Sequence, residues 1–306
     1  MRHKKTTIIF LAIALAFVGT GFVAALNGYF GGGDTIPEDT FTRGLVGYWS
    51  FDEGTGQIAY DNSDNNNDGT LGGTSSIETS DPVWTTPTSS PSQRGVKGNA
   101  LNFDGEDDYV DCGSDESVKP NHISISVWLR LRFVPDTSNR IVSKWWDGSS
   151  RSYELFINTG SVDTSTLYFY VSTDGNIPDT SCYHSFSAYH GLWTHVVATY
   201  DGSIQRLYFN GVEVASNSGE SGNINPNNAD LIIGAQPRDA NPTETFLHYF
   251  NGAIDEVRIY NRALSAEEIR YHYNRGCPVA SWNFDEGSGS TIYDSSGNQH
   301  HGTLHE

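Results

Sequence analysis

Residues 123–131 read Ile-Ser-Ile-Ser-Val-Trp-Leu-Arg-Leu, and this alternation decides the fold class. Apolar side chains recur at every second position, which is the period of a β-strand with one buried face. A helix would repeat its apolar positions every three to four residues. The stretch therefore predicts a half-buried strand in a sheet that packs against a second layer.

Shorter stretches of the same kind lie further along the chain, at 153–157, 167–171, 195–200, 206–209 and 253–260. Asn210-Gly211 separates two apolar triplets, a pattern typical of a tight β-hairpin. Because no helical crossovers separate these strands, the sequence predicts an all-β fold with two packed antiparallel sheets.

One helix is expected after the last strand. Ser265 and Glu268 form a capping-box pattern, and the helix should run to about residue 275 and stop at Gly276. Residues 74–93 are rich in Ser, Thr and Pro and predict a long loop. Trp49, Trp128 and Trp193 are expected to fill the core.

The charge balance narrows the class of partner. The 306 residues contain 18 Lys or Arg and 37 Asp or Glu, a formal net charge of −19. Such an acidic chain is poorly suited to nucleic acid, so a nucleic-acid partner is not expected. Acidity favours solubility and divalent cations instead.

The N-terminus predicts export. Residues 1–26 combine a basic start with an apolar run at 8–26, which favours either a cleaved signal peptide or a retained transmembrane anchor. Residues 27–43, with a Gly31-Gly32-Gly33 tract, are expected to be a linker. The rest of the chain is expected to be extracellular or on the cell surface, with membrane contact only through an uncleaved N-terminus. The three cysteines, Cys112, Cys182 and Cys277, fit either one disulfide plus a thiol or three small buried residues.

An internal repeat divides the chain. Residues 48–73 align without gaps on 281–306 at an offset of 233, with 13 of 26 positions identical. We expect a first domain at 44–276 and the start of a second, incomplete copy at 277–306. This tail is too short to bury a core. Three alternatives remain open for it: truncation of a longer tandem chain, disorder, or donation of strands to a sheet edge.

Several motifs carry a family resemblance. They occur in order at 47–56, 60–63, 69–71, 100–105, 108–110, 193–202, 209–211 and 252–265. Together they resemble a LamG-like jelly-roll domain of the concanavalin A-like lectin/glucanase superfamily. The resemblance implies one concave and one convex antiparallel sheet, with ligands on the concave face or its loops. It does not imply one function, because this fold serves lectins, adhesion domains and enzymes.

The resemblance also implies a structural Ca²⁺. In related laminarinase-type enzymes, an Asp in a strand like 255–260 binds calcium together with an acidic residue of the first strand, so Asp255 and Asp52 (or Glu53) would be partners. Asp61 and Asn62 are further oxygen donors in the first motif block. The alternative is that Asp52 and Asp61 make turn bonds to the backbone and that Asp255 pairs with Arg258 or Arg262 at the surface.

Candidate ligand-binding residues surround a pair of adjacent tryptophans. Neighbouring side chains in a strand face opposite ways, so one tryptophan of the pair is expected in the core and the other on the concave side. A loop before Trp193 that carries Tyr183, His184, Tyr189 and His190 is expected to close over the same edge. The predicted ligand-binding residues are Trp145, Trp146, Asp147, Arg151, Tyr153 and His184.

Catalysis is not expected. Glycoside hydrolysis needs two suitably placed carboxylates. The string most similar to the family's catalytic E-x-D-x-x-E motif is Glu106-Asp107-Asp108-Tyr109-Val110-Asp111, which matches poorly because its last member is Asp. His195 is expected to be structural. The sequence therefore predicts an exported, non-catalytic module that binds carbohydrate or a glycoprotein. The alternatives are a filament subunit that self-associates through 280–306, and a glycoside hydrolase.

Overall fold

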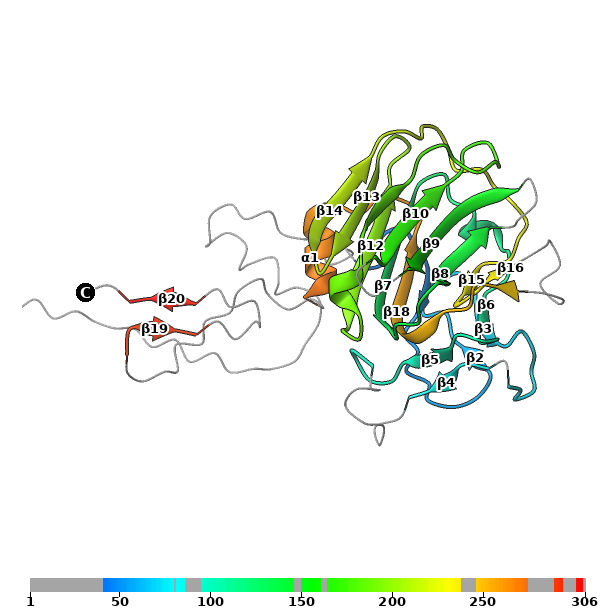
Figure 1. The fold of residues 1–306 in the computed structure, drawn as a ribbon, viewed down its shortest axis with the longest axis horizontal. Coiled ribbons are helices and arrows are strands. Elements are labelled where there is room, and N and C mark those ends of the chain that lie inside the picture. The colour runs from blue at the N-terminus through cyan, green and yellow to red at the C-terminus, as the bar shows by residue number, and fades with distance from the viewer. Residues whose placement is uncertain are drawn as a thin grey trace, which may run out of the picture. The chain divides into compact units, whose positions relative to one another are not determined.

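Two eight-stranded antiparallel sheets form a sandwich in the computed structural model, which describes residues 41–79, 81–85, 95–145, 150–160, 164–237, 246–274, 289–293 and 301–304. The predicted N-terminal segment 1–26, most of the linker, and Trp146, Asp147 and Cys277 lie outside these residues. The two layers are visible in Figure 1. The predicted all-β jelly-roll sandwich is confirmed.

Sheet A has the strand order β14-β13-β12-β7-β18-β5-β4, with β1 also paired to β18. Its strands are β1 (Leu45–Trp49), β4 (Val83–Trp84), β5 (Leu101–Asp104), β7 (Ile123–Leu131), β12 (Thr194–Tyr200), β13 (Gln205–Phe209), β14 (Val212–Asn217) and β18 (Asn251–Tyr260). The short strand β4 lies inside the stretch that was predicted as a loop.

Sheet B has the order β11-β10-β9-β8-β15-β6-β3-β2. Its strands are β2 (Ile58–Ala59), β3 (Gly69–Leu71), β6 (Val110–Asp111), β8 (Thr137–Trp145), β9 (Arg151–Thr159), β10 (Thr166–Val171), β11 (Cys182–Ser185) and β15 (Ile232–Ile233). A small hairpin of β16 (Gln236–Pro237) and β17 (Phe246–Leu247) follows β15. Alternate residues of both sheets meet in one apolar core, in which Trp49 is fully buried.

The face of β7 that was expected to be exposed is in fact covered. Ser124 Oγ donates to the carbonyl of Arg262 and accepts from the Leu264 N–H, so the chain after β18 lies over this strand. Trp128 stacks on Tyr273 of the helix α1 (Ala266–Tyr273), with ring centroids 5.7 Å apart. Trp128 is therefore buried outside the core, and Trp193 is only half-buried beneath Arg130.

The helix α1 forms as its cap predicts. Ser265 Oγ accepts from the Glu268 N–H, and the Glu268 carboxylate accepts from the Ser265 N–H. Two cysteines, Cys112 and Cys182, are buried free thiols. Among the described residues, no helix combines the length and apolarity that a membrane crossing requires.

The repeat has a structural counterpart. Strands β2 and β3 pair Ile58 with Thr70 and Ala59 with Gly69. Strands β19 (Thr291–Ile292) and β20 (Gly302–Thr303) pair Thr291 with Thr303 and Ile292 with Gly302. Each position is shifted by the same 233 residues as the sequence repeat, so the two hairpins share one register.

Candidate functional site

A cleft of about 710 Å³ opens at one end of strands β8, β9 and β10. Its walls carry hydroxyl and amide side chains together with aromatic rings. Residues that contribute to it include Thr137, Ser138, Asn158, Thr166, Tyr168 and Tyr249. Hydroxyls and amides both donate and accept hydrogen bonds, so this lining suits a ligand rich in hydroxyl groups.

One wall of the cleft is held by internal hydrogen bonds. The hydroxyls of Thr137 and Thr159 lie 2.8 Å apart and both donate to the carbonyl of Val134. Asn139 Nδ2 donates to Thr137 Oγ1 at 3.0 Å, and its Oδ1 accepts from the Asn251 N–H at 3.1 Å. A wall fixed in this way loses little conformational freedom when a ligand binds.

Two lining residues have unusual backbone geometry. Asp136 has φ of 54° and His248 has φ of 59°, in the left-handed region that non-glycine residues seldom adopt. Strained residues of this kind cluster at ligand sites, where the surrounding structure holds them in place.

Aromatic side chains continue from the cleft across the outer face of sheet B. Leu155, Leu167 and Phe169 point into the core, so the residues between them point outward. We call this row the aromatic strip, and its members are Trp145, Phe156, Tyr168, Tyr170 and Tyr183. Tyr168 belongs to both the strip and the cleft, and Tyr183 beside it is 60% exposed.

A buried ion pair lies beneath the strip. Arg140 Nε is 2.9 Å from Glu154 Oε1, which also accepts from Ser143 Oγ at 2.9 Å. The Arg140 guanidinium lies 4.2 Å from the centre of the Phe156 ring. These contacts fix the ring of Phe156, on which Tyr168 stacks at 5.1 Å.

The predicted ligand-binding residues divide into three groups. Trp145 is 4% exposed, packs on Tyr170 and belongs to the strip, while Arg151 lies over the Trp145 ring and borders the strip. Tyr153 is fully buried and donates to the carbonyl of Val118, so its side chain is part of the core. Trp146 and Asp147 lie outside the described residues.

His184 faces away from the strip. Its ring lies 5.5 Å from Phe209 in the core, because alternation along β11 turns it to the side opposite Tyr183. The neighbouring Tyr183, which pairs with Tyr168, is the residue that reaches the strip.

Most of the cleft was missed from the sequence. Thr137, Asn158 and His248 are far apart along the chain and carry no motif. The alternation Leu167-Tyr168-Phe169-Tyr170 was a usable signal, because it places two tyrosines on the face opposite the core.

The predicted metal ligands Asp255 and Asp52 both contact residues 96–99. Asp255 is fully buried, and its Oδ2 accepts from the backbone N–H of Val96 at 2.7 Å and of Lys97 at 3.2 Å. Its Oδ1 has no partner among the described residues. Asp52 Oδ1 accepts from the Asn99 N–H at 3.0 Å. Burial raises the pKa of Asp255 to about 8, and Glu256 and Asp52 add to this through their charges.

The alternative of a surface ion pair for Asp255 is wrong. Arg258 pairs with Glu256 at 2.5 Å, and Arg262 pairs with Glu268. Both arginines therefore have other acidic partners.

Asp61 makes turn hydrogen bonds to the backbone, which was the alternative to a role as metal ligand. Its Oδ1 accepts from the N–H groups of Tyr48 and Ser63, and its Oδ2 accepts from the Asn67 N–H and Ser63 Oγ, all at 2.8 Å. Asn62 donates through Nδ2 to the carbonyl of Tyr48. Both oxygens of Asp61 are thus engaged in holding the loop.

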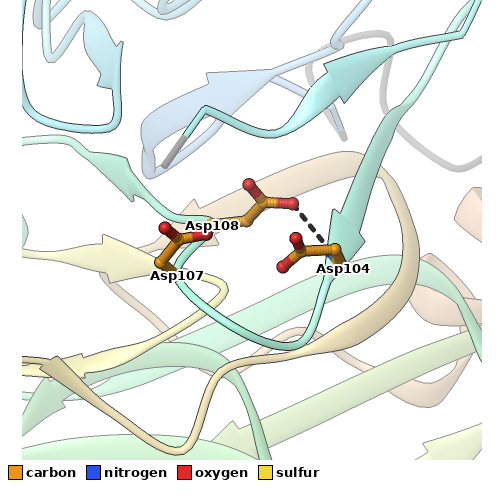
Figure 2. Close-up of side chains that lie close together, drawn as sticks. All are labelled: Asp104, Asp107 and Asp108. Atoms are coloured by element: carbon orange, nitrogen blue, oxygen red, sulfur yellow. Dashed lines mark hydrogen bonds between the residues drawn. The ribbon is translucent and has the colours of Figure 1, made fainter. Parts of the chain in front are cut away.

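A second acidic group follows β5. Asp104, Asp107 and Asp108 gather on one turn, as Figure 2 shows. Asp108 is 3% exposed, and its Oδ2 accepts from the Asp104 N–H at 2.7 Å, which closes the turn. Burial raises the pKa of Asp108 to about 7. Glu106 lies exposed on the same turn.

The two packed antiparallel sheets define a jelly-roll domain. The chain belongs to the concanavalin A-like lectin/glucanase superfamily, whose laminin G-type family model matches residues 104–270. The sequence resemblance is thereby confirmed.

Two curated relatives are similar to part of the chain. Mouse pappalysin-1 is 26% identical over 182 residues, which is 56% of this chain and 11% of that protein. Human pappalysin-1 is 27% identical over 133 residues, which is 41% of this chain and 8% of that protein. The chain thus matches about a tenth of these relatives' length.

Solved structures support the fold. The binding domain of botulinum neurotoxin serotype G has a TM-score of 0.54 at 15% identity, and the match covers 81% of this chain and 55% of that one. The serotype D ligand-binding domain, solved with N-acetylneuraminic acid, has a TM-score of 0.53 at 13% identity over 78% of this chain and 52% of that one.

Proposed function

We propose that this chain is a non-catalytic, extracellular module that binds carbohydrate through the cleft and the aromatic strip. The observation that carries the proposal is the position of Tyr168, which lines the cleft and also contacts Phe156 and Tyr183 of the strip. A sugar ring lying on Tyr168 would have hydroxyl and amide partners on one side and further aromatic faces on the other. This combination of apolar face and polar rim matches the amphipathic surface of a sugar.

A binding role is favoured over hydrolysis because the carboxylate beneath the strip, that of Glu154, is buried and already paired. Glu154 is 1% exposed and held by Arg140 and Ser143. A glycosidase would need two carboxylates within about 5–9 Å that are accessible to the sugar. The serotype D neurotoxin domain, solved with the anionic sugar N-acetylneuraminic acid, supports sugar binding by a domain of similar fold but not a particular class of sugar.

We extend the proposal to a structural calcium ion held by Asp255 and Asp52. The residues fit the ion, because a buried carboxylate oxygen of Asp255 has no described partner and carboxylates are preferred Ca²⁺ ligands. The ion would neutralise the charge that burial makes costly at this position.

Residues 277–306 are proposed to be the start of a second, incomplete copy of the domain. The shared register of β19–β20 and β2–β3 supports this reading. Two copies on one chain would raise the avidity for a polymeric glycan through effective concentration.

The experiment that tests binding compares the half-buried Tyr168 of the cleft with an exposed tyrosine outside it. The purified full chain is titrated against a panel of neutral and charged oligosaccharides by calorimetry, together with Tyr168→Ala and Tyr60→Ala. Tyr60 is 55% exposed and stands after β2, outside the cleft lining, so it is the matched control. We expect Tyr168→Ala to weaken binding by about tenfold or more and Tyr60→Ala to leave it unchanged. Equal affinities in the three proteins would place the site elsewhere.

A further inference from the structure

The cleft carries little charge of its own. Among the described residues that line it, Asp136 is the one carboxylate, and none is a lysine or arginine. The remaining polar lining consists of hydroxyls, amides, the phenols of Tyr168 and Tyr249, and the imidazole of His248. Recognition of a carboxylate or sulfate ordinarily uses arginine or lysine, because these groups supply charge-assisted hydrogen bonds.

One arginine beside the cleft, Arg140, is engaged by other groups. Arg140 donates to Ser138 at the inner end of the cleft, but its Nε is shared between Glu154 Oε1 and Gln236 Oε1. Its side chain is 10% exposed and lies over Phe156. The guanidinium is thus part of the support beneath the strip.

The rim of the cleft is acidic. Gly105 lines the cleft, and its turn carries Asp104 and Glu106, both exposed, as well as Asp107. Asn251, which also lines the cleft, binds the carbonyl of Asp104 through its Nδ2 at 2.7 Å and so ties this turn to the wall. An anionic ligand in the cleft would meet Asp136 on one side and this turn on another.

From these observations we infer that the cleft selects uncharged glycans and excludes sialylated, sulfated and uronic-acid glycans. The inference rests on the proposed carbohydrate-binding function and names its ligand class. An anionic sugar would lose its hydration without gaining a cationic partner among the described lining residues, and Asp136 and the Asp104–Asp107 turn would repel it. A neutral sugar meets hydroxyl and amide groups that can pair with its own hydroxyls, and it brings no charge that would have to be desolvated.

The test uses matched pairs of probes on the purified full chain. One pair is N-acetyllactosamine and its sialylated form, and another is dextran and dextran sulfate of equal length. We expect the neutral member of at least one pair to bind about tenfold or more tightly than its anionic counterpart. We also expect the affinity for the neutral probe to be almost independent of salt concentration.

A charge-removal variant locates the selectivity. Asp136→Asn removes the negative charge. Asparagine tolerates the left-handed backbone conformation that this position adopts, with φ of 54°. The substitution should reduce the preference for the neutral probe by about three- to tenfold at low salt. Asp64→Asn, at an exposed loop position outside the cleft lining, is the control and should leave the preference unchanged.

Three results would overturn the inference. Tighter binding of the sialylated or sulfated probe, weakened by salt, would refute neutral selection and leave the carbohydrate-binding function standing. An unchanged preference in Asp136→Asn would remove the assigned cause. Failure of every neutral and anionic probe to bind, with Tyr168→Ala indistinguishable from the parent, would refute the proposed function itself.

Discussion

Arg262 and Glu268 form a two-pronged ion pair that joins the end of β18 to the start of α1. Arg262 Nη1 lies 3.0 Å from Glu268 Oε2, and Nη2 lies 2.8 Å from Oε1. The same carboxylate accepts from Arg43 at 2.9 Å and from the Ser265 N–H at 2.8 Å. One glutamate therefore connects the chain before β1, the exit of β18 and the helix that covers Trp128.

Replacement of Glu268 by Gln should destabilise the domain at neutral pH by about 1–3 kcal/mol, because charge-assisted hydrogen bonds are lost. The bonds from Arg262 and Ser265 lower the pKa of Glu268 to about 2, although burial opposes this shift. A lowered acidic pKa stabilises the fold above the unfolded value and loses that effect as pH falls toward 2. Urea unfolding at pH 7 and pH 3 should thus show a smaller difference between variant and parent at pH 3. An equal difference at both pH values would contradict this role.

Asp108→Asn should stabilise the domain at alkaline pH but not at acidic pH. The pKa of Asp108 is raised to about 7, so the folded state holds a proton that the unfolded chain has released between about pH 4 and 7. Stability of the parent therefore falls across this range, and the variant escapes that loss. The gain should reach about 2–4 kcal/mol at pH 8 in urea unfolding. Glu106→Gln, which removes one charge from the same turn at an exposed site, is the control and should show a much smaller gain.

Calcium should raise the unfolding temperature of the full chain relative to EDTA, because a ligand that binds the folded state stabilises it by mass action. Asp255→Asn should abolish the difference, since it removes the charge of the carboxylate whose Oδ1 has no described partner. Asp108→Asn, a change at another buried carboxyl, should retain it. An identical unfolding temperature of the parent in calcium and in EDTA would remove the ion from the proposal.

Lys144→Met should flatten the pH dependence of stability between pH 8 and 10.5. Lys144 is fully buried, its Nζ donates to the carbonyl of Ala229, and burial lowers its pKa to about 8. Between its folded and unfolded pKa values, the unfolded chain binds the extra proton, so the free energy of unfolding rises with pH. The parent should gain about 2–3 kcal/mol over this range relative to the variant, measured by urea unfolding. Parallel curves for both proteins would show that the ammonium carries no burial cost.

The strands were predictable from sequence because the alternation of apolar and polar residues that produces them lies within each strand. The alternation at 123–131 gives β7 residue for residue, and the Asn210-Gly211 turn joins β13 to β14. Burial of the second face of β7 was not predictable, because the cover comes from Leu264 and Tyr273, more than a hundred residues later. The alternating pattern describes a strand's faces but not what later packs on them.

The site was predicted less well for the same reason. Trp145 and Arg151 were predicted together because they are close in sequence, and in the structure Trp145 belongs to the strip and Arg151 borders it. Tyr153 and His184 fall on core-facing positions, and the phase of alternation in β9 and β11 was not resolved from sequence. The cleft joins strand ends from β8, β9 and β10 to residues beside β17 and β18, a grouping that only the sheet order creates.

The hairpins β2–β3 and β19–β20 share one register but have different neighbours. Their comparison distinguishes strand pairing that depends on nearby residues from pairing that depends on the rest of the sandwich. Strand β3 pairs with β6 and buries Leu71, whereas β19 and β20 form a two-stranded sheet in which the equivalent Leu304 is 57% exposed. Among the described residues, β19 and β20 pair only with each other, so their pairing is attributed to the hairpin's own residues. During folding, this edge of the sandwich can therefore form early from contacts close in sequence. Strand β18 instead pairs with β1, β5 and β7, which come from distant parts of the chain, so its pairing depends on long-range contacts.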